Sequence, residues 1–287
     1  MLRRQLIILV LGATGNTGGE VARQLIAAGE RPRLLVRTPE KAREFEGKAE
    51  IVQGDLDDPA SLAAAMRRIE KLYLVGTGTN GAELERNAID AAKAAGVRHV
   101  VKLSVIGADD PQITFARWHA EAERHLMASG LAWTMLRPGN FMANSLGWAE
   151  TIRSQGVFYQ PTGQGQWAAI DPVDIGAVAV RALTTPGHEG QSYPLTGPES
   201  FSAAGYAAVL ARVLGRPVQF VDVPPDAAKA GMLESGMPAG YTDALLNLLA
   251  AMKAGHTDGI TNTVEQVTGR KPGTFEAWAR RNAAAFQ

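Results

Sequence analysis

The chain has 287 residues, of which 46% are hydrophobic, so it can bury a large core in one or two domains. Its 29 basic and 29 acidic residues balance, which argues against functions that need a basic surface, such as binding nucleic acid or an acidic membrane. Cysteine is absent, which excludes disulfides, thiolate nucleophiles and cysteine-ligated metal centres, so redox chemistry would need a bound cofactor.

The first residues resemble a secretory signal, since Arg3 and Arg4 precede an apolar run at residues 6–11. The run is short, however, and continues directly into a glycine-rich turn without a cleavage site. No stretch of about 18 apolar residues follows that could span a membrane. We therefore expect a soluble, cytoplasmic protein.

Strand-like and helical patterns alternate between residues 5 and 136, which is typical of a parallel sheet built from strand-helix-strand units. Asp58 before Pro59 predicts the capped start of one helix, and Gly29, Gly96 and Gly130 are expected to end three others. The expected strands are residues 6–11, 33–36, 51–53, 72–75, 100–103 and 132–136.

A glycine-rich turn follows the first expected strand and opens the first expected helix. Glycines at such a turn let the backbone approach a pyrophosphate, whose charge the helix N-terminus attracts. The alternative is an ordinary tight turn between a strand and a helix. We interpret the turn as a dinucleotide site in a Rossmann-type, doubly wound α/β domain. The expected cofactor-binding residues of the turn are Gly12, Thr14, Gly15, Asn16, Thr17 and Gly18.

The end of the second strand predicts which nicotinamide cofactor binds. A carboxylate there would bind the ribose of NAD(H), whereas a cation would pair with the 2′-phosphate of NADP(H). Arg37 stands at this point and Lys41 follows, with neither aspartate nor glutamate beside Arg37. The alternative is a solvated surface arginine. We predict that NADP(H) is preferred, with NAD(H) as an alternative cofactor.

The residues after the third and fourth strands are further candidates, because ligands of an open parallel sheet lie across the carboxyl ends of its strands. Asp55 and Leu56 are expected to frame the adenine, although Asp55 could equally be a structural turn residue. Gly76, Thr77 and Gly78 are expected near the diphosphate and ribose.

The pattern changes after Pro138 to glycine-rich loops and short strands, which predicts a second, smaller and mainly helical lobe. We assign residues 1–150 to the NAD(P)-binding domain and residues 151–287 to a substrate-binding lobe, with parts of 171–197 packing back on the Rossmann sheet. Short strands are expected at residues 157–159, 166–168 and 192–195. Helices are expected at residues 171–183, 201–214, 242–253 and 274–286.

Several segments together resemble the atypical short-chain dehydrogenase/reductases, and most of all their NmrA-like group. The resemblance covers nearly the whole chain and fades after about residue 222. It implies a Rossmann-type fold and an NAD(P)H cofactor, in a group that includes quinone and dye reductases and a cofactor-sensing regulator. The segments that carry it are residues 12–18, 36–37, 119–123, 129–138 and 170–175.

The resemblance also implies where the proton-handling residues should be. Ordinary members of the superfamily carry Tyr-x-x-x-Lys on the helix after the fifth strand, and this chain has Phe115 and His119 at those two places. The usual acid is therefore missing, as the resemblance implies for the quinone and dye reductases. A ketone needs such an acid, typically worth about 10²- to 10⁴-fold in rate. A quinone, a cationic dye or an iminium ion spreads the incoming electrons and needs it less.

His119 and Ser104 are the expected catalytic residues. His119 could bind the nicotinamide ribose, as a cofactor-binding residue, or assist a proton transfer, because an unperturbed pKa of about 6.5 makes both forms accessible. The alternative is a surface histidine paired with Glu123 one turn later. Ser104 could orient the substrate or merely cap a turn. The histidine spacings suit no metal ion, so no metal site is expected.

Aromatic residues after the sixth strand are candidates for contact with a flat substrate. Asn140 and Phe141 are expected to approach the nicotinamide. A wall of aromatic side chains could hold the acceptor, although aromatics in such numbers more often belong to an ordinary core. The expected wall residues are Phe141, Trp148, Tyr159 and Trp167.

We predict an NADPH-dependent oxidoreductase that transfers hydride to a quinone-like or otherwise electrophilic small molecule, such as a dye or an imine. The alternative is a non-catalytic regulatory protein that senses NADP(H) and signals to a protein partner. The other expectations are a small-molecule acceptor and a monomer or homodimer, with neither nucleic acid nor membrane as a partner.

Overall fold

The structure is a computed structural model that describes residues 7–76 and 78–287. The chain divides into two units, each built from several separate stretches of sequence. The first unit comprises the chain up to Ala108, Trp118–Arg137 and Ile175–Tyr193. The second unit comprises Asp109–Arg117, Pro138–Asp174 and Pro194–Gln287.

A seven-stranded sheet with the order β3-β2-β1-β4-β5-β6-β9 is the centre of the first unit. The neighbouring pairs from β3 to β6 are parallel, and Leu9 of β1 lies opposite both Arg33 of β2 and Leu72 of β4. The strand order turns back at β1, so the β1 and β4 carboxyl ends mark the point where such sheets bind ligands. The strands are β1 Ile8–Leu11, β2 Arg33–Val36, β3 Glu50–Gln53, β4 Lys71–Leu74, β5 His99–Leu103, β6 Ala132–Pro138 and β9 Gln191–Leu195.

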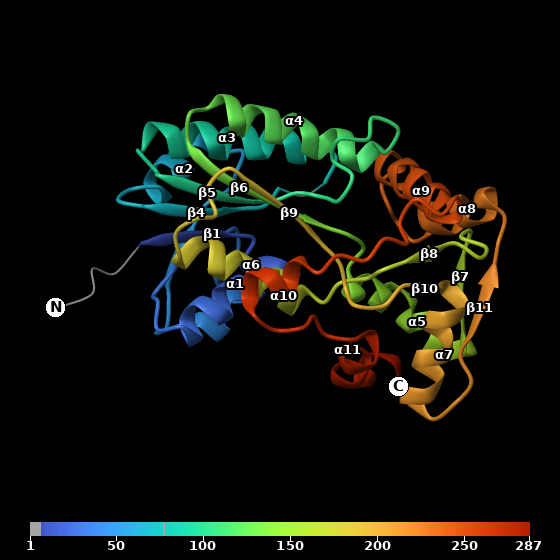
Figure 1. The fold of residues 1–287 in the computed structure, drawn as a ribbon. Coiled ribbons are helices and arrows are strands. Elements are labelled where there is room, and N and C mark those ends of the chain that lie inside the picture. Colours follow the sequence, from blue (N-terminus) through green and yellow to red (C-terminus); the bar gives the residue numbers. More distant parts are fainter. Residues whose placement is uncertain (1–6, 77) are drawn as a thin grey trace. The chain divides into compact units, whose positions relative to one another are not determined.

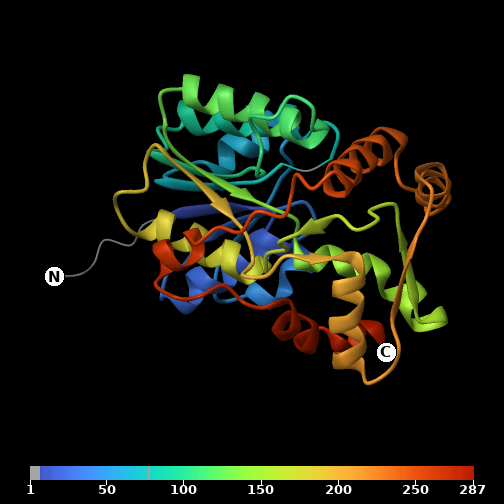
Figure 2. The ribbon, with the colours of Figure 1, turned by 45° about the vertical axis from the view of Figure 1, so that its right-hand side comes forward.

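Helices cover both faces of this sheet, as the doubly wound prediction required (Figure 1). Helices α1 (Asn16–Ala27) and α6 (Pro172–Thr184) lie on one face. Helices α2 (Pro59–Ala65), α3 (Gly81–Ala94) and α4 (Thr114–Ala128) lie on the other, and the turned view in Figure 2 agrees. The central strands are therefore covered twice, which is why β1 is a continuous run of buried apolar residues.

The second unit contains two small sheets and a set of helices. Strand β7 pairs in parallel with β11, and β8 pairs antiparallel with β10. The strands are β7 Val157–Gln160, β8 Gln166–Trp167, β10 Phe201–Ser202 and β11 Gln219–Asp222. The helices are α5 Ala149–Gln155, α7 Ala203–Leu214, α8 Pro225–Glu234, α9 Ala239–Lys253, α10 Thr263–Thr268 and α11 Phe275–Arg281. Short 3₁₀ helices occupy Pro39–Phe45 in the first unit, and Met142–Trp148 and Ala283–Phe286 in the second.

Aromatic rings form much of the core of the second unit. Trp148 stacks on Phe158 with ring centroids 4.1 Å apart. Tyr206 lies between Trp167, at 4.9 Å, and Phe275, at 4.6 Å. The Tyr206 hydroxyl donates to the carbonyl of Trp167 over 2.7 Å, so this buried polar group is satisfied.

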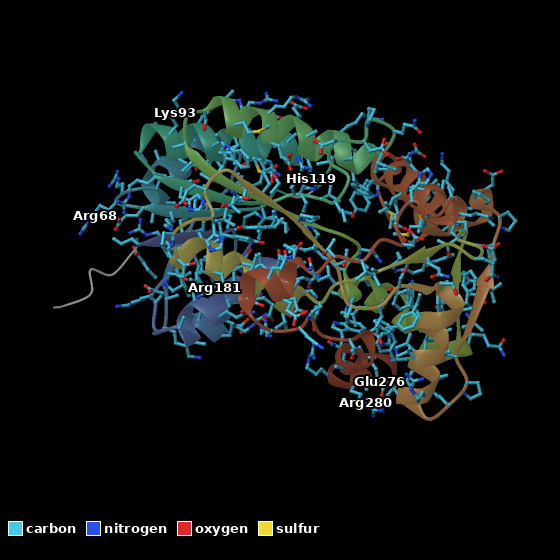
Figure 3. All side chains as sticks on the ribbon, in the orientation of Figure 1. Arg68, Lys93, His119, Arg181, Glu276 and Arg280 are labelled. Atoms are coloured by element: carbon cyan, nitrogen blue, oxygen red, sulfur yellow. The ribbon has the colours of Figure 1, made fainter. Side chains whose placement is uncertain are left out.

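The C-terminal segment is attached to two buried carboxylates at the start of α6. Asp174 Oδ2 accepts a hydrogen bond from the Gly273 amide over 2.8 Å, and Arg270 lies 3.4 Å from Asp174 Oδ1. Arg281 of α11 pairs with Asp171. Arg280 pairs instead with Glu276 on the same helix, and Figure 3 labels both residues.

The expected strands of the first unit are confirmed, with boundaries that differ by one or two residues. The expected strand at 6–11 begins at Ile8, and its first residue lies outside the described part of the chain. Asp58 caps α2 by accepting from the Ala60 amide. Across residues 7–76 and 78–287, no helix is long and apolar enough to cross a membrane.

Three expectations for the second unit are wrong in detail. Phe201 and Ser202 were expected in a helix but form β10, where they pair with Trp167 and Gln166, and Ser202 caps α7. The expected helix at 274–286 is broken at Asn282 into α11 and a 3₁₀ helix. Ala168 does not extend β8, which ends at Trp167. The elements without a prediction are α5, β11, α8, α10 and the 3₁₀ helices at Pro39–Phe45 and Met142–Trp148.

Candidate functional site

The turn after β1 needs glycine because the backbone folds tightly on itself. Gly12 has a φ of +64°, and its carbonyl accepts from the Gly15 amide over 2.9 Å. A Cβ atom on Gly18 would lie 2.3 Å from the Gly12 carbonyl oxygen. Glycine at position 18 therefore lets α1 begin directly behind the turn.

The N-terminus of α1 is open to an anion. Thr14, Gly15 and Asn16 are exposed, whereas Thr17 and Gly18 are buried. The helix has no side-chain N-cap and no acidic residue in its first turn. Neither a capping side chain nor a first-turn carboxylate therefore neutralises its free amides and positive dipole end, which fits the pyrophosphate of a dinucleotide.

Cationic groups lie at the end of the neighbouring strand β2. Arg37 and Lys41 are both exposed. The guanidinium of Arg37 makes no side-chain hydrogen bond or ion pair with any described residue, while its backbone carbonyl accepts from Gln53 over 3.2 Å. Arg37 is therefore free to form a two-pronged contact with a phosphate.

Asp55 and Leu56 form a local turn after β3. The Asp55 carboxylate accepts from the Leu56 amide over 2.7 Å, and Ser61 Oγ bonds to both the amide and the carbonyl of Asp55. The Leu56 carbonyl accepts from Asn87 over 3.1 Å. These bonds give Asp55 a structural role in the turn, and its contact with adenine stays a prediction.

The turn after β4 is held by a buried glutamate. The Gly76 amide donates to Glu85 Oε1 over 3.0 Å, and a Cβ atom on Gly76 would lie 2.6 Å from Glu85 Cγ. Gly78 has a φ of +87°. Thr77, also expected at the cofactor, lies outside the described residues.

A fully buried lysine connects this glutamate with the candidate catalytic histidine. Lys102 Nζ lies 3.0 Å from Glu85 Oε2, 2.9 Å from the Leu103 carbonyl and 3.2 Å from His119 Nδ1. His119 belongs to α4 and thus contacts a residue of β5; Figure 3 labels His119. The surface pair of His119 with Glu123, which was the alternative from the sequence, does not form, since Glu123 bonds to Ser104 and Arg137.

The contact with Lys102 determines the form of the imidazole. An ammonium group can only donate, so Nδ1 of His119 accepts and the ring proton lies on Nε2. Burial lowers the pKa of His119 to about 3, and the charge of Lys102 contributes to this. At neutral pH His119 is therefore a hydrogen-bond donor through Nε2 rather than an imidazolium acid.

Burial also affects the partner carboxylate. It raises the pKa of Glu85, while the Lys102 ammonium and the Gly76 amide oppose that rise. The opposing contacts are a direct ion pair and a hydrogen bond, both at normal distances. These two contacts favour the ionised form of the Glu85 carboxylate.

Ser104 belongs to a second buried group beside this one. Its hydroxyl donates to Glu123 Oε1 over 2.5 Å. Arg137 holds the same carboxylate with two bonds, from Nε over 3.0 Å and from Nη2 over 2.6 Å. Ser104 thus already donates its hydroxyl proton to Glu123. Contact between Ser104 and a substrate stays a prediction, and in such a contact the hydroxyl oxygen would be the acceptor.

The candidate residues of the second unit have mixed surroundings. Asn140 Oδ1 accepts from Asn144 over 2.6 Å, and the half-buried Phe141 forms a backbone bridge with Ile170. Trp148 and Trp167 are buried in the aromatic core, which was the alternative for the wall residues. Tyr159 is 45% exposed and its hydroxyl donates to Gln155. Phe115, at the place of the family's tyrosine, packs edge-on against Tyr241.

The buried charged residues of these two groups were not predicted from the sequence as site residues. They are Glu85, Lys102 and Arg137. Glu123 was considered only as a surface partner of His119, whereas it binds Ser104 and Arg137. A signal was present, since Lys102 stands among the apolar residues of the buried strand β5. Glu85 lies on the buried face of α3 with Ala88, Ile89 and Ala92. A charge at a buried position needs a partner, so these two positions could have been paired.

Comparisons with known proteins find relatives over nearly the whole chain. A family model described as NAD(P)H-binding matches residues 12–186. The NAD(P)H azoreductase of Xenophilus azovorans is 42% identical over 98% of this chain and 99% of the relative. A (4-alkanoyl-5-oxo-2,5-dihydrofuran-3-yl)methyl phosphate reductase of Streptomyces griseus is 40% identical over 98% of this chain and 99% of the relative. The crystal structure of the NADPH-dependent quinone oxidoreductase QOR2 of Escherichia coli with NADPH has a TM-score of 0.88 and 29% identity, over 97% of this chain and all of that one.

Proposed function

Because the chain belongs to the NAD(P)H-binding family, in the NmrA-like group of atypical short-chain dehydrogenase/reductases, we propose that it is an NADPH-dependent reductase of electrophilic small molecules. Quinones, azo and triphenylmethane dyes, and imines are the proposed acceptors. The observation that carries this proposal is the contact of Lys102 Nζ with Nδ1 of His119, the residue at the place of the family's lysine, because this contact leaves the ring proton on Nε2.

The residues around the β1 turn fit the cofactor. Bound NADPH supplies a hydride, which carries two electrons to the acceptor. The amides at the start of α1 would hold its pyrophosphate, and Arg37 with Lys41 would pair with its 2′-phosphate. This arrangement supports a preference for NADP(H) over NAD(H).

The groups near His119 favour acceptors that need little proton help. With a pKa of about 3, His119 cannot act as an imidazolium acid near pH 7, and Ser104 already donates its proton to Glu123. His119 can still donate one hydrogen bond from Nε2 to an acceptor that becomes negative as it is reduced. The final proton then comes from water. A quinone or an azo compound can be reduced without a protein acid more readily than a simple ketone, because it spreads the incoming electrons over more atoms.

The experiment that tests this proposal is NADPH oxidation, followed by absorbance, against a panel of acceptors. Quinones, azo dyes, triphenylmethane dyes and imines are expected to be reduced, and simple ketones much more slowly. Tight NADPH binding without turnover of any acceptor would contradict the proposal and favour a cofactor sensor. The proposed partner is the small-molecule acceptor. We propose that the protein is a monomer or a homodimer, and analytical ultracentrifugation can determine which of the two forms is present.

A further inference from the structure

Lys102 is a charged residue in the centre of a buried strand. Val101 and Leu103 flank it on β5, and its side chain has no exposed surface. Its three ammonium protons match three acceptors, which are a carboxylate, a backbone carbonyl and an imidazole nitrogen. Lys102 therefore has no donor left for a substrate, and any influence on the reaction must pass through these partners.

The partners of Lys102 connect two parts of the candidate site. Glu85 binds Lys102 through Oε2 and the Gly76 amide through Oε1, so one carboxylate holds both the turn after β4 and the lysine. The lysine in turn fixes His119 by its Nδ1 atom. The charge of Glu123 on α4 also acts on Glu85 and raises its pKa, and Glu123 is itself paired with Arg137 of β6.

We propose that Lys102 is a positioning residue for the reduction, and that with Glu85 it holds His119 as a neutral imidazole with its proton on Nε2. The proposal rests on the reductase function proposed above. A donor at Nδ1 excludes the tautomer whose proton is on Nδ1, and it also limits rotation of the ring. His119 then presents a fixed N–H group without being able to release a proton as an acid.

The first test measures the histidine in the unmodified protein, by ¹⁵N NMR of the ring nitrogens between pH 5 and 8. We expect a single neutral tautomer for His119, with the proton on Nε2 and no titration in this range. A proton on Nδ1, or a titration within this range, would overturn the proposal. This test needs no acceptor, so it is independent of whether the reductase function is correct.

The second test asks whether Lys102 acts through His119. The variant K102M/E85Q removes both charges together, so no unpaired charge remains buried, and the side-chain carbonyl of the new glutamine can still accept from the Gly76 amide. We expect this variant to lower kcat with a quinone about fivefold while the Kd for NADPH changes less than twofold. We also expect the proton of His119 to be distributed over both ring nitrogens.

A double-mutant cycle with H119A separates positioning from general damage, because residues that act through one another are not additive. In the H119A background, K102M/E85Q is expected to lower kcat no further. An equal fall in both backgrounds, or no fall in the native background, would overturn the proposal while leaving the reductase function intact. K71M is the matched control, since Lys71 begins the neighbouring strand β4, and its kcat is expected to be unchanged.

Discussion

Arg37 is the residue on which cofactor choice should depend. Replacing it with glutamine removes the charge that would pair with the 2′-phosphate, and a hydrogen bond to a charged group is typically worth about 1.5–3 kcal/mol. We expect R37Q to raise the Kd for NADPH roughly 10- to 100-fold. The Kd for NADH, which has no 2′-phosphate, is expected to change little.

Titration of the protein with each cofactor measures both values. Arg31 is a suitable control, because it is exposed and precedes β2, at the opposite end of the strand from Arg37. R31Q should bind both cofactors like the native protein. If R37Q raised the Kd values for NADPH and NADH by the same factor, Arg37 would not be the residue that recognises the 2′-phosphate.

His119 should contribute one hydrogen bond to the reaction. H119A removes the Nε2–H donor, and a net hydrogen bond is worth about 1 kcal/mol, so we expect kcat with a quinone to fall about fivefold. The Kd for NADPH should stay within twofold if the histidine acts on the acceptor. Steady-state kinetics with a separate binding measurement checks this, and a loss of NADPH affinity with unchanged kcat would assign His119 to the ribose instead.

Single residues were predictable from the sequence where backbone geometry demanded one residue type. Gly12 and Gly18 were identified because a strand, a turn and a helix follow one another there, and the close contact of Gly18 with the Gly12 carbonyl is the physical reason. The ionic contacts of Lys102 could not be read in the same way. They join residues 85, 102 and 119, whose neighbourhood depends on the packing of α3 and α4 on the sheet.

The contact between the β1 turn and α1 makes a prediction for a whole element. In G18A the added Cβ would lie 2.3 Å from the Gly12 carbonyl, so the turn and the helix must separate. We expect a lower thermal midpoint and at least a tenfold loss of NADPH affinity, because the amides of α1 no longer face the same position. Differential scanning fluorimetry with and without NADPH measures both effects.

Gly231 provides the matched control for this substitution. It lies within α8 and a Cβ atom there would meet no neighbour within 4 Å. Alanine is favoured over glycine in a helix by roughly 1 kcal/mol, so G231A should leave the midpoint unchanged or raise it slightly. Similar losses in G18A and G231A would contradict a specific role for the turn.

Elements of the first unit were predictable because each buried strand is a short apolar run between turn residues. The elements of the second unit were harder to predict. Strand β11 pairs with β7 across a long stretch of chain, and α8 has no buried residue that would produce a periodic apolar pattern. Phe201 is apolar, like the residues that α7 buries, so the pairing of Phe201 and Ser202 with β8 could not be recognised from the local pattern.

For the whole molecule, buried neutral histidines should make stability depend on pH. His99 Nε2 lies 2.9 Å from Thr134 Oγ1, which itself donates to the His188 carbonyl, so Nε2 of His99 is the donor. Burial lowers the pKa of His99 to about 4, and the charge of Lys71 contributes to this. The proton that converts the imidazole of His99 to imidazolium is therefore bound more tightly in the unfolded chain than in the folded protein. The free energy of unfolding consequently decreases as the pH falls below about 6.5.

Between pH 7 and pH 5, this single group should reduce the free energy of unfolding by about 2 kcal/mol. H99Q removes the titrating group, so its stability should fall by about 2 kcal/mol less than that of the native protein over the same range. Urea denaturation followed by circular dichroism at both pH values checks this. H256Q, at an exposed histidine, should behave like the native protein, and parallel pH dependence in H99Q would contradict the prediction.

The order of the sheet also has a consequence for protein synthesis. Strand β6 is covered by β9, which comes much later in the chain. While the chain emerges from the ribosome, the amides and carbonyls along the outer side of β6 are open to a strand from another molecule until residues 191–195 arrive. A chain that stops before Gln191 would keep this edge open permanently, so its aggregation would reflect a missing strand rather than a defective cofactor site.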